Sequence, residues 1–272
     1  MVLFFLLFVH SPVVEPTMKQ APVVNQQPQA TVGGVTIATF KCYTAPIFAG
    51  TLAAVTIAVC YYFSCIVNGT SNCWPATDIT HTARYPPAEY IFRVGIPIAM
   101  VILMQVWWVI FSWLKAEEGN TRWGNPLLGF AFIFGIMGAV LLIIASVLIQ
   151  PGQMDWTLHT IGATGFFLFT FVAQVIVTGH LASLMATNPT ITSPMSLKIK
   201  QTTVSLFFTA LITDAINELG YGPFGPNLGN VVEYFVTLMV LIWFVSCAID
   251  FKDRLILNLV LSSPSSSPSP SI

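Results

Sequence analysis

Long runs of hydrophobic residues, separated by short polar segments, dominate the chain from about residue 45 to residue 250. A helix that crosses a bilayer needs about 20 consecutive apolar residues, and most of these runs reach that length. The pattern predicts an all-α fold, a polytopic membrane helix bundle with six transmembrane helices. The expected spans are 45–67, 94–114, 127–149, 160–183, 202–219 and 231–250.

The fifth span has the weakest hydrophobic pattern of the six. Residues 202–213 are largely apolar, but Asp214 and Glu218 follow before a Gly- and Pro-rich loop. The basic residues support the span, because Lys and Arg collect in cytosolic loops. Six spans with a cytosolic N-terminus leave only Arg84 and Arg93 outside the cytosol. The other eight of the ten basic residues then lie inside: Lys19, Lys41, Lys115, Arg122, Lys198, Lys200, Lys252 and Arg254.

The two ends of the chain differ in composition from the central region. Residues 1–40 are expected to be a flexible N-terminal tail, 41–254 the transmembrane domain, and 255–272 a disordered Ser/Pro-rich tail. Met1–Val9 is apolar but too short to span a bilayer. It also has neither the basic segment nor the cleavage site of a signal peptide. Both termini are therefore expected in the cytosol.

The composition limits the classes of function. Hydrophobic residues make up 55% of the chain and charged residues only 8%, whereas about a quarter of a soluble domain is charged. So few charges could not cover a water-facing surface of this size, and lipid is the solvent that fits. The net charge of −1 and the lack of a basic patch argue against nucleic acid as a partner.

Two side-chain patterns concern how the spans pack and how deep they lie. Ala131, Gly135 and Ala139 recur at every fourth residue, as in helices that approach closely in lipid. Chance in a span rich in Gly and Ala explains the spacing about as well. A group of tryptophans near the expected cytosolic boundary is typical of an interfacial belt: Trp107, Trp108, Trp113 and Trp123.

Ionisable residues gather at the side expected to face the lumen or the cell exterior. Carboxylates at membrane depth are costly and usually face the interior of a bundle. The candidate lumenal polar pocket comprises Glu89, Arg93, His159, Asp214, Glu218 and Glu233. It is either a site for a lipid headgroup or a cation, or a set of ion pairs in which Arg84, Arg93 and His159 neutralise the carboxylates. The sequence leaves both interpretations open.

Signatures of a conventional enzyme or of a metal site are not found in the sequence. The four histidines are too widely separated along the expected topology to bind one metal, and no cofactor motif is present. Asp155 and His159 have the i,i+4 spacing of an acid–base pair. However, an aspartate at a helix start is also favoured by the helix dipole alone. Neither a metal nor a cofactor is expected, and whether the chain is an enzyme stays undecided, with a non-catalytic role favoured.

Two modifications are expected in the first loop on the lumenal side. Asn68 begins an N-glycosylation sequon, but it directly follows a span, so access for the transferase is uncertain. Cys65 and Cys73 could form a disulfide in an oxidising compartment. A free Cys65 buried in the span explains the sequence equally well.

Motifs in the first loop and in two spans resemble a known family. Residues 78–83 (DITHTA) and 85–93 (YPPAEYIFR) are similar to a loop of the damage-regulated autophagy modulator (DRAM) family. That family includes the FGF-receptor-activating protein, post-GPI-attachment factor two and yeast suppressor-of-kinase proteins. Residues 159–163 (HTIGA) resemble its H-x-x-G-A motif, and 232–251 resemble its E-[WY]…D-F pattern. His81 departs from the pattern, because the family has aspartate there.

The resemblance implies a six-span protein of the Golgi, the lysosome or the plasma membrane. It implies a role in autophagy, in phosphoinositide-kinase recruitment or in GPI-anchor lipid remodelling. Glu89, His159 and Glu233 match motif positions of the family and are the best site candidates. No catalytic residue is carried over.

Three classes of function follow. The favoured one is a non-catalytic membrane regulator of lipid homeostasis, trafficking or autophagy. It would bind membrane lipids such as GPI or phosphoinositide, or a cytosolic protein. Basic loop residues, including Lys198 and Lys200, could contact anionic lipid or a kinase scaffold. The favoured interpretation is that they only orient the chain by the positive-inside rule. The alternative is a GPI-anchor lipid-remodelling enzyme or its essential subunit. A transporter fits least, because the acidic residues of the spans, Asp250 excepted, lie in one half of the membrane.

Overall fold

A computed structural model gives the fold and describes residues 34–68, 77–118, 126–149, 156–220, 225, 227–252 and 256–262. The chain divides into two compact units, one of residues 41–255 and one of residues 1–40 with 256–272. In the second unit, strand β1 (Gly34–Lys41) pairs with β2 (Ile256–Ser262) in a two-stranded sheet. Both strands fall in the segments expected to be tails. The other tail residues lie outside the described residues, so the tail assignments stay predictions.

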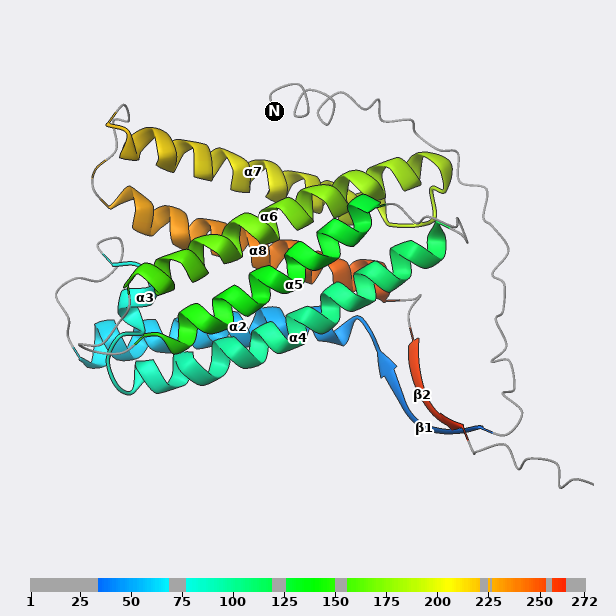
Figure 1. Cartoon of the computed structure of the whole chain (residues 1–272), viewed down its shortest axis with the longest axis horizontal. Coiled ribbons are helices and arrows are strands. Elements are labelled where there is room, and N and C mark those ends of the chain that lie inside the picture. The colour runs from blue at the N-terminus through cyan, green and yellow to red at the C-terminus, as the bar shows by residue number, and fades with distance from the viewer. Residues whose placement is uncertain are drawn as a thin grey trace, which may run out of the picture. The chain divides into compact units, whose positions relative to one another are not determined.

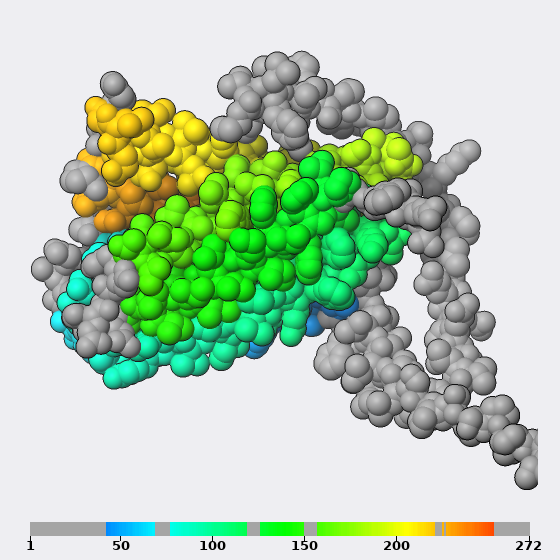
Figure 2. Space-filling view, viewed as in Figure 1, coloured from blue at the N-terminus to red at the C-terminus, as the bar shows by residue number. Residues whose placement is uncertain are grey.

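The unit of residues 41–255 is built from helices, which confirms the predicted all-α polytopic bundle. Its helices are α2 (Thr44–Tyr61), which continues into the π-helix η1 (Tyr62–Val67), α3 (Ile79–Thr82), α4 (Ala88–Glu117), α5 (Pro126–Val147), α6 (Trp156–Thr187), α7 (Pro194–Glu218) and α8 (Leu228–Phe251). Helix α4 packs between α2 and α5, and α5 packs on α6 (Figure 1). Helix α7 packs mainly on α8, which also contacts α2. In the space-filling view, α4, α5 and α6 cover one face of the bundle (Figure 2).

Five of the described helices are long and apolar enough to cross a membrane: Thr44–Val67, Ala88–Glu117, Pro126–Val147, Thr157–Thr187 and Leu228–Phe251. They correspond to five of the six predicted spans. Helix α7 corresponds to the predicted fifth span, but it is not among the five. Its sequence carries charged and hydroxyl residues along most of its length, and these lower its hydropathy. Six spans are therefore supported only in part.

The helices extend beyond the apolar runs that predicted them. Helix α4 begins at Ala88, so Glu89 and Arg93 lie in its first turns and not in a loop. Helix α7 begins at Pro194, and Lys200 belongs to it. Ser193 caps α7, because its hydroxyl oxygen accepts a hydrogen bond from the Ser196 amide at 3.0 Å. Proline suits the position after the cap, since its missing N–H has no helical partner there.

The small residues of α5 lie at a close helix contact. Ala131 and Ala139 are fully buried, and Gly135 is buried between them. A methyl group added at Gly135 would overlap the indole of Trp107 on α4. Gly135, at the centre of the predicted four-residue spacing, thus lies directly against α4.

The prediction of a tryptophan belt is wrong for two of its members. Trp107 and Trp113 are only 1% and 6% exposed, whereas Trp108 is 59% exposed. Trp107 packs against Trp243 and Phe244 of α8, with ring centroids 5.6 and 5.2 Å away. The prediction considered depth along the helix but not helical face. Trp123 lies outside the described residues.

Candidate functional site

A polar cavity lies at the end of the bundle that holds α3, which we call the α3 end. Its volume is about 430 Å³, within the range of about 300–1,000 Å³ typical of ligand sites. Helices α6, α7 and α8 line it together with residues of α3 and the residue before α3. Its polar lining residues are Asp78, Thr80, His159, Thr160, Thr164, Asp214 and Glu233.

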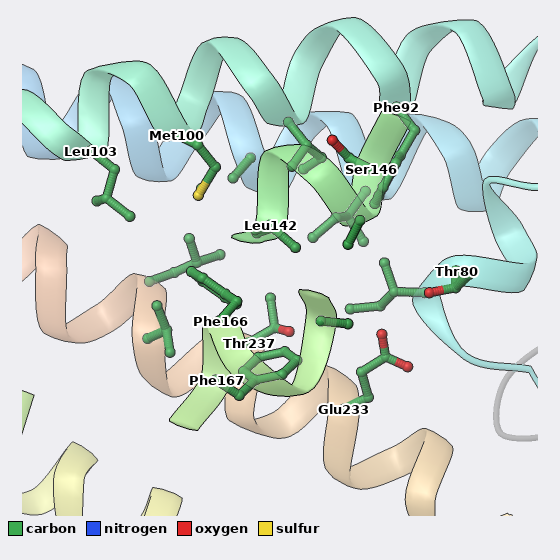
Figure 3. A pocket seen from close by; sticks show the side chains of 18 of the residues that line it. Thr80, Phe92, Met100, Leu103, Leu142, Ser146, Phe166, Phe167, Glu233 and Thr237 are labelled. Carbon is green, nitrogen blue, oxygen red and sulfur yellow. The ribbon is translucent and has the colours of Figure 1, made fainter. Parts of the chain in front are cut away.

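A smaller apolar cavity of about 60 Å³ adjoins it and runs toward the middle of the bundle (Figure 3). Thr80 and Glu233 line both cavities, and Met100 and Leu103 of α4 line the deeper part of the apolar one. From Glu233 to Phe244 the α8 wall is about 16 Å long, close to half of a hydrocarbon core of about 30 Å. An empty cavity of about 150 Å³ holds a benzene molecule. At its present width, the apolar cavity is therefore too narrow for an acyl chain.

His159 connects α6 to α5 and α3. Its Nδ1 lies 3.0 Å from the carbonyl oxygen of Ala145, and its Nε2 lies 3.1 Å from Thr80 Oγ1. A carbonyl only accepts hydrogen bonds, so Nδ1 carries the proton in the neutral ring and Nε2 accepts from the Thr80 hydroxyl. Both ring nitrogens therefore have protein partners. This arrangement connects α3 to α5 and α6 beside the cavity.

Glu233 and Asp78 place two carboxylates at the cavity from different elements. Glu233 accepts a hydrogen bond from the backbone N–H of Ile79, at the start of α3. Asp78 caps α3, because its Oδ1 accepts from the backbone N–H of His81 at 2.6 Å. The His81 ring also pairs with Asp78, with Nδ1 2.8 Å from Oδ2. The short helix α3 is thus held by carboxylates at its N-terminus.

Asp214 brings a third carboxylate to the cavity from α7. Its Oδ1 faces Gly229 of α8, where an added Cβ would lie 3.6 Å away. This oxygen is buried and has no hydrogen-bond partner among the described residues. Carboxylate oxygens of this kind usually have a donor, so the atom is available to a bound group.

The other two acidic candidates lie outside the cavity. Glu89 is 5% exposed and pairs with Arg93 one turn along α4, with Oε1 and Nη1 3.0 Å apart. Glu218 is exposed at the end of α7 and does not line the cavity. The structure therefore brings together His159, Asp214 and Glu233 from the predicted pocket, and leaves Glu89, Arg93 and Glu218 apart from them.

No group of three or more His, Cys, Asp or Glu residues within the described part of the chain is arranged to hold a metal ion. The two modification sites are only partly described. Asn68 is exposed at the end of η1, but the sequon threonine lies outside the described residues. Cys65 is in a disulfide. Its expected partner, Cys73, lies outside the described residues, so that pairing stays a prediction, as does glycosylation of Asn68.

A family model described as the Frag1/DRAM/Sfk1/Cwh43P N-terminal domain matches residues 40–254. The match covers the helical unit almost completely and more than half of the chain. The chain belongs to the Frag1/DRAM/Sfk1 family. This confirms the family that the loop and span motifs indicated. Neither a curated protein nor a solved structure matches the chain.

This Frag1/DRAM/Sfk1 protein has a second polar cluster, at the opposite end of α7 and α8, that the sequence did not reveal. Lys200 Nζ donates to Asp250 Oδ2 at 2.7 Å and to the hydroxyls of Ser196 and Ser246 at 2.8 Å each. Thr192 donates to the other Asp250 oxygen. The Lys200 side chain is fully buried, so it is not available for a contact with anionic lipid, which was one of the two interpretations of the basic loop residues.

A spacing in the sequence could have indicated this cluster. Ser196 and Lys200 are four residues apart, as are Ser246 and Asp250, so each pair shares one helix face. The positive-inside rule counts lysines by loop, and it takes no account of a partner on another helix. The rule therefore treated Lys200 as a topology marker, whereas its charge is neutralised inside the bundle.

Proposed function

We propose that this multi-pass membrane protein is a non-catalytic regulator that acts by binding a membrane lipid in the polar cavity at the α3 end. The cavity combines carboxylates and hydroxyls with apolar walls, which suits an amphiphilic ligand. Its lining includes Thr160, Thr164 and Leu168 of α6, which are exposed on the outside of the helix. Since Leu168 lies about three turns below the start of α6, the cavity opens toward the bilayer as well as toward the membrane surface.

The observation that carries the proposal is the 430 Å³ volume at the junction of four separate chain segments. Tightly packed bundles leave few voids larger than a water molecule. His159 is held between Thr80 of α3 and Ala145 of α5, which supports a structural role for this candidate residue. Lipid homeostasis, trafficking or autophagy are the processes in which we place such a regulator.

We further propose that the α3 end faces the lumen or the cell exterior, with both termini in the cytosol. The disulfide at Cys65 lies at the α3 end, and disulfides persist in oxidising compartments. If α7 also spans the membrane, so that there are six spans, the basic residues favour the same orientation. We propose that the protein lies in an endomembrane such as the Golgi or lysosome, or in the plasma membrane.

Lipid remodelling, as on a GPI anchor, is the second candidate function. It is favoured by Glu233, which lines both the polar and the apolar cavity and whose side chain points into the apolar one (Figure 3). An enzyme would place its reactive group at such a boundary, next to the headgroup of a bound lipid. Purified protein that releases or transfers acyl chains with turnover would favour this candidate over the regulator.

The experiment fills the cavity with a larger side chain. Ala163 of α6 lines both cavities, and Ala163→Phe fills the space between them. Ala186→Phe is the matched control, because Ala186 is exposed near the other end of the same helix. Lipids that stay bound through purification are quantified by mass spectrometry in both variants and in the wild type.

A lipid species retained by the wild type and by Ala186→Phe, but lost in Ala163→Phe, supports the proposal. Equal retention of the same bulk lipids by all three proteins contradicts it, and the cavity is then a packing defect.

A further inference from the structure

The polar cavity is lined by three acidic residues, and its described lining includes no Lys or Arg. Asp78, Asp214 and Glu233 line it, whereas no Lys or Arg is among its described lining residues. Arg93, the basic residue in the first turns of α4, is paired with Glu89. A buried carboxylate without a counter-charge is costly.

Two of the three carboxylates are left for a ligand. Asp78 is paired with His81 and caps α3. Within the described part of the chain, neither Asp214 nor Glu233 has an ion pair, and Asp214 Oδ1 has no hydrogen-bond donor although it is buried. Glu233 has a single backbone donor, from Ile79, whereas a carboxylate has about four acceptor positions.

We propose that the polar cavity selects a lipid with an ammonium headgroup, which Asp214 and Glu233 hold between them. This inference rests on the proposed lipid binding and names the headgroup class. A metal ion is not favoured, because no described set of ligands converges closely enough to hold one. An ammonium group on a flexible headgroup can contact carboxylates that come from two helices without requiring fixed coordination geometry.

The rest of the headgroup then lies at the mouth of the cavity. Thr160 and Thr164 are exposed there, and their hydroxyls can donate to phosphate or ester oxygens. Because the described lining holds no cation, the phosphate is not drawn inside. Leu168 and Leu211 face the remaining part of the opening and provide apolar contact for the start of the chains. An anionic headgroup without an amine would meet only like charge inside the cavity.

The experiment reconstitutes the full chain in nanodiscs that contain equal amounts of phosphatidylethanolamine, phosphatidylcholine and phosphatidylglycerol with identical chains. Lipids retained after extraction into detergent are measured by mass spectrometry. Asp214→Asn/Glu233→Gln removes both charges with little change of shape. Glu218→Gln is the matched control, because Glu218 is one turn from Asp214 but outside the cavity.

We expect the wild type and Glu218→Gln to retain the ethanolamine or choline lipid about tenfold over phosphatidylglycerol, as one charge-assisted contact would give. The double variant should lose this preference. Greater retention of the ethanolamine lipid than of the choline lipid would indicate that the headgroup is recognised through hydrogen bonds to a primary ammonium. Equal retention of the two would indicate recognition by charge alone. Either result supports the inference.

Retention of bound lipid with no headgroup preference, or with phosphatidylglycerol preferred, overturns the ammonium inference and leaves lipid binding intact. If no lipid is retained by any of the proteins, the proposed function itself fails. The wild-type comparison alone decides the headgroup question even if the double variant does not fold.

Discussion

Lys200 and His159 are two buried polar side chains of this bundle whose hydrogen-bond partners lie largely on other helices. Lys200 has three side-chain acceptors, from its own helix and from α8. His159 has a carbonyl of α5 on one side and a hydroxyl of α3 on the other. The contrast is Asp214, which has a buried oxygen without a described partner. The role of each of these residues therefore depends on contacts with other helices, which its position in the sequence does not reveal.

The buried ion pair makes a clear prediction. Lys200→Met leaves the Asp250 carboxylate buried without its cation, which we expect to lower the free energy of unfolding by about 3–5 kcal/mol. Lys198→Met is the control, because Lys198 is exposed two residues earlier, and it should change stability by less than about 0.5 kcal/mol. The measurement is thermal unfolding in detergent. Equal losses for the two variants would show that the pair contributes nothing specific.

The candidate residues show how far sequence reasoning extends. Because charge in lipid is costly, acidic residues of the spans were expected to face the interior of the bundle. This expectation selected Asp214 and Glu233, which the structure places at one cavity. The same argument could not exclude Glu89, because its pairing with Arg93 depends on α4 starting earlier than the apolar run. Asp78 and Thr80 were not predicted as lining residues. Asp78 caps and Thr80 belongs to a helix of four residues, which is too short to be recognised from a hydrophobic pattern.

At the scale of the helices, close approach between α4 and α5 depends on the absence of one methyl group. Gly135→Ala would force the methyl group into the Trp107 ring, and overpacking of this kind costs about 1–3 kcal/mol. The higher helix propensity of alanine offsets at most about 1 kcal/mol of this cost. We therefore expect a net loss of stability.

Gly129→Ala provides the comparison on the same helix. An added Cβ at Gly129 meets nothing within 4 Å, so only the gain in helix propensity remains. Thermal unfolding of the two variants should shift in opposite directions. A stabilised Gly135→Ala protein would mean that Trp107 is free to move away.

The positions of the helices were predictable from hydrophobicity, but their ends and their faces were not. Each predicted span other than 202–219 corresponds to a helix that is apolar enough to cross a membrane. Polar residues such as Arg93 and Lys198 continue the helices, since backbone hydrogen bonding does not stop where hydrophobicity does. Trp107 packs on Trp243 of α8, and its depth along α4 could not predict whether its ring faces this helix or the lipid.

At the scale of the whole molecule, the topology depends on whether α7 crosses the membrane. If it does, the turn before α7 and the segment after it lie on opposite sides. We predict that Thr190→Cys and Leu219→Cys, both at exposed positions, react with an impermeant maleimide from opposite sides of sealed vesicles. Leu219→Cys should react on the side of the α3 end.

Labelling before and after detergent permeabilisation provides the measurement. If both cysteines react from the same side, α7 does not span, and the C-terminus then lies opposite the N-terminus. The orientation that the basic residues favour would be lost with it.

The Lys200–Asp250 pair also bears on how the chain is made. The ribosome synthesises α7 before α8, and α7 on its own is too polar to be among the helices that can cross a membrane. Until Asp250 emerges, the Lys200 ammonium has no counter-ion, and a lone charge in a membrane helix costs about 3 kcal/mol in translocon insertion when it lies centrally. We therefore expect helices α7 and α8 to enter the bilayer together as a hairpin, so that translation of α8 completes the site at the α3 end.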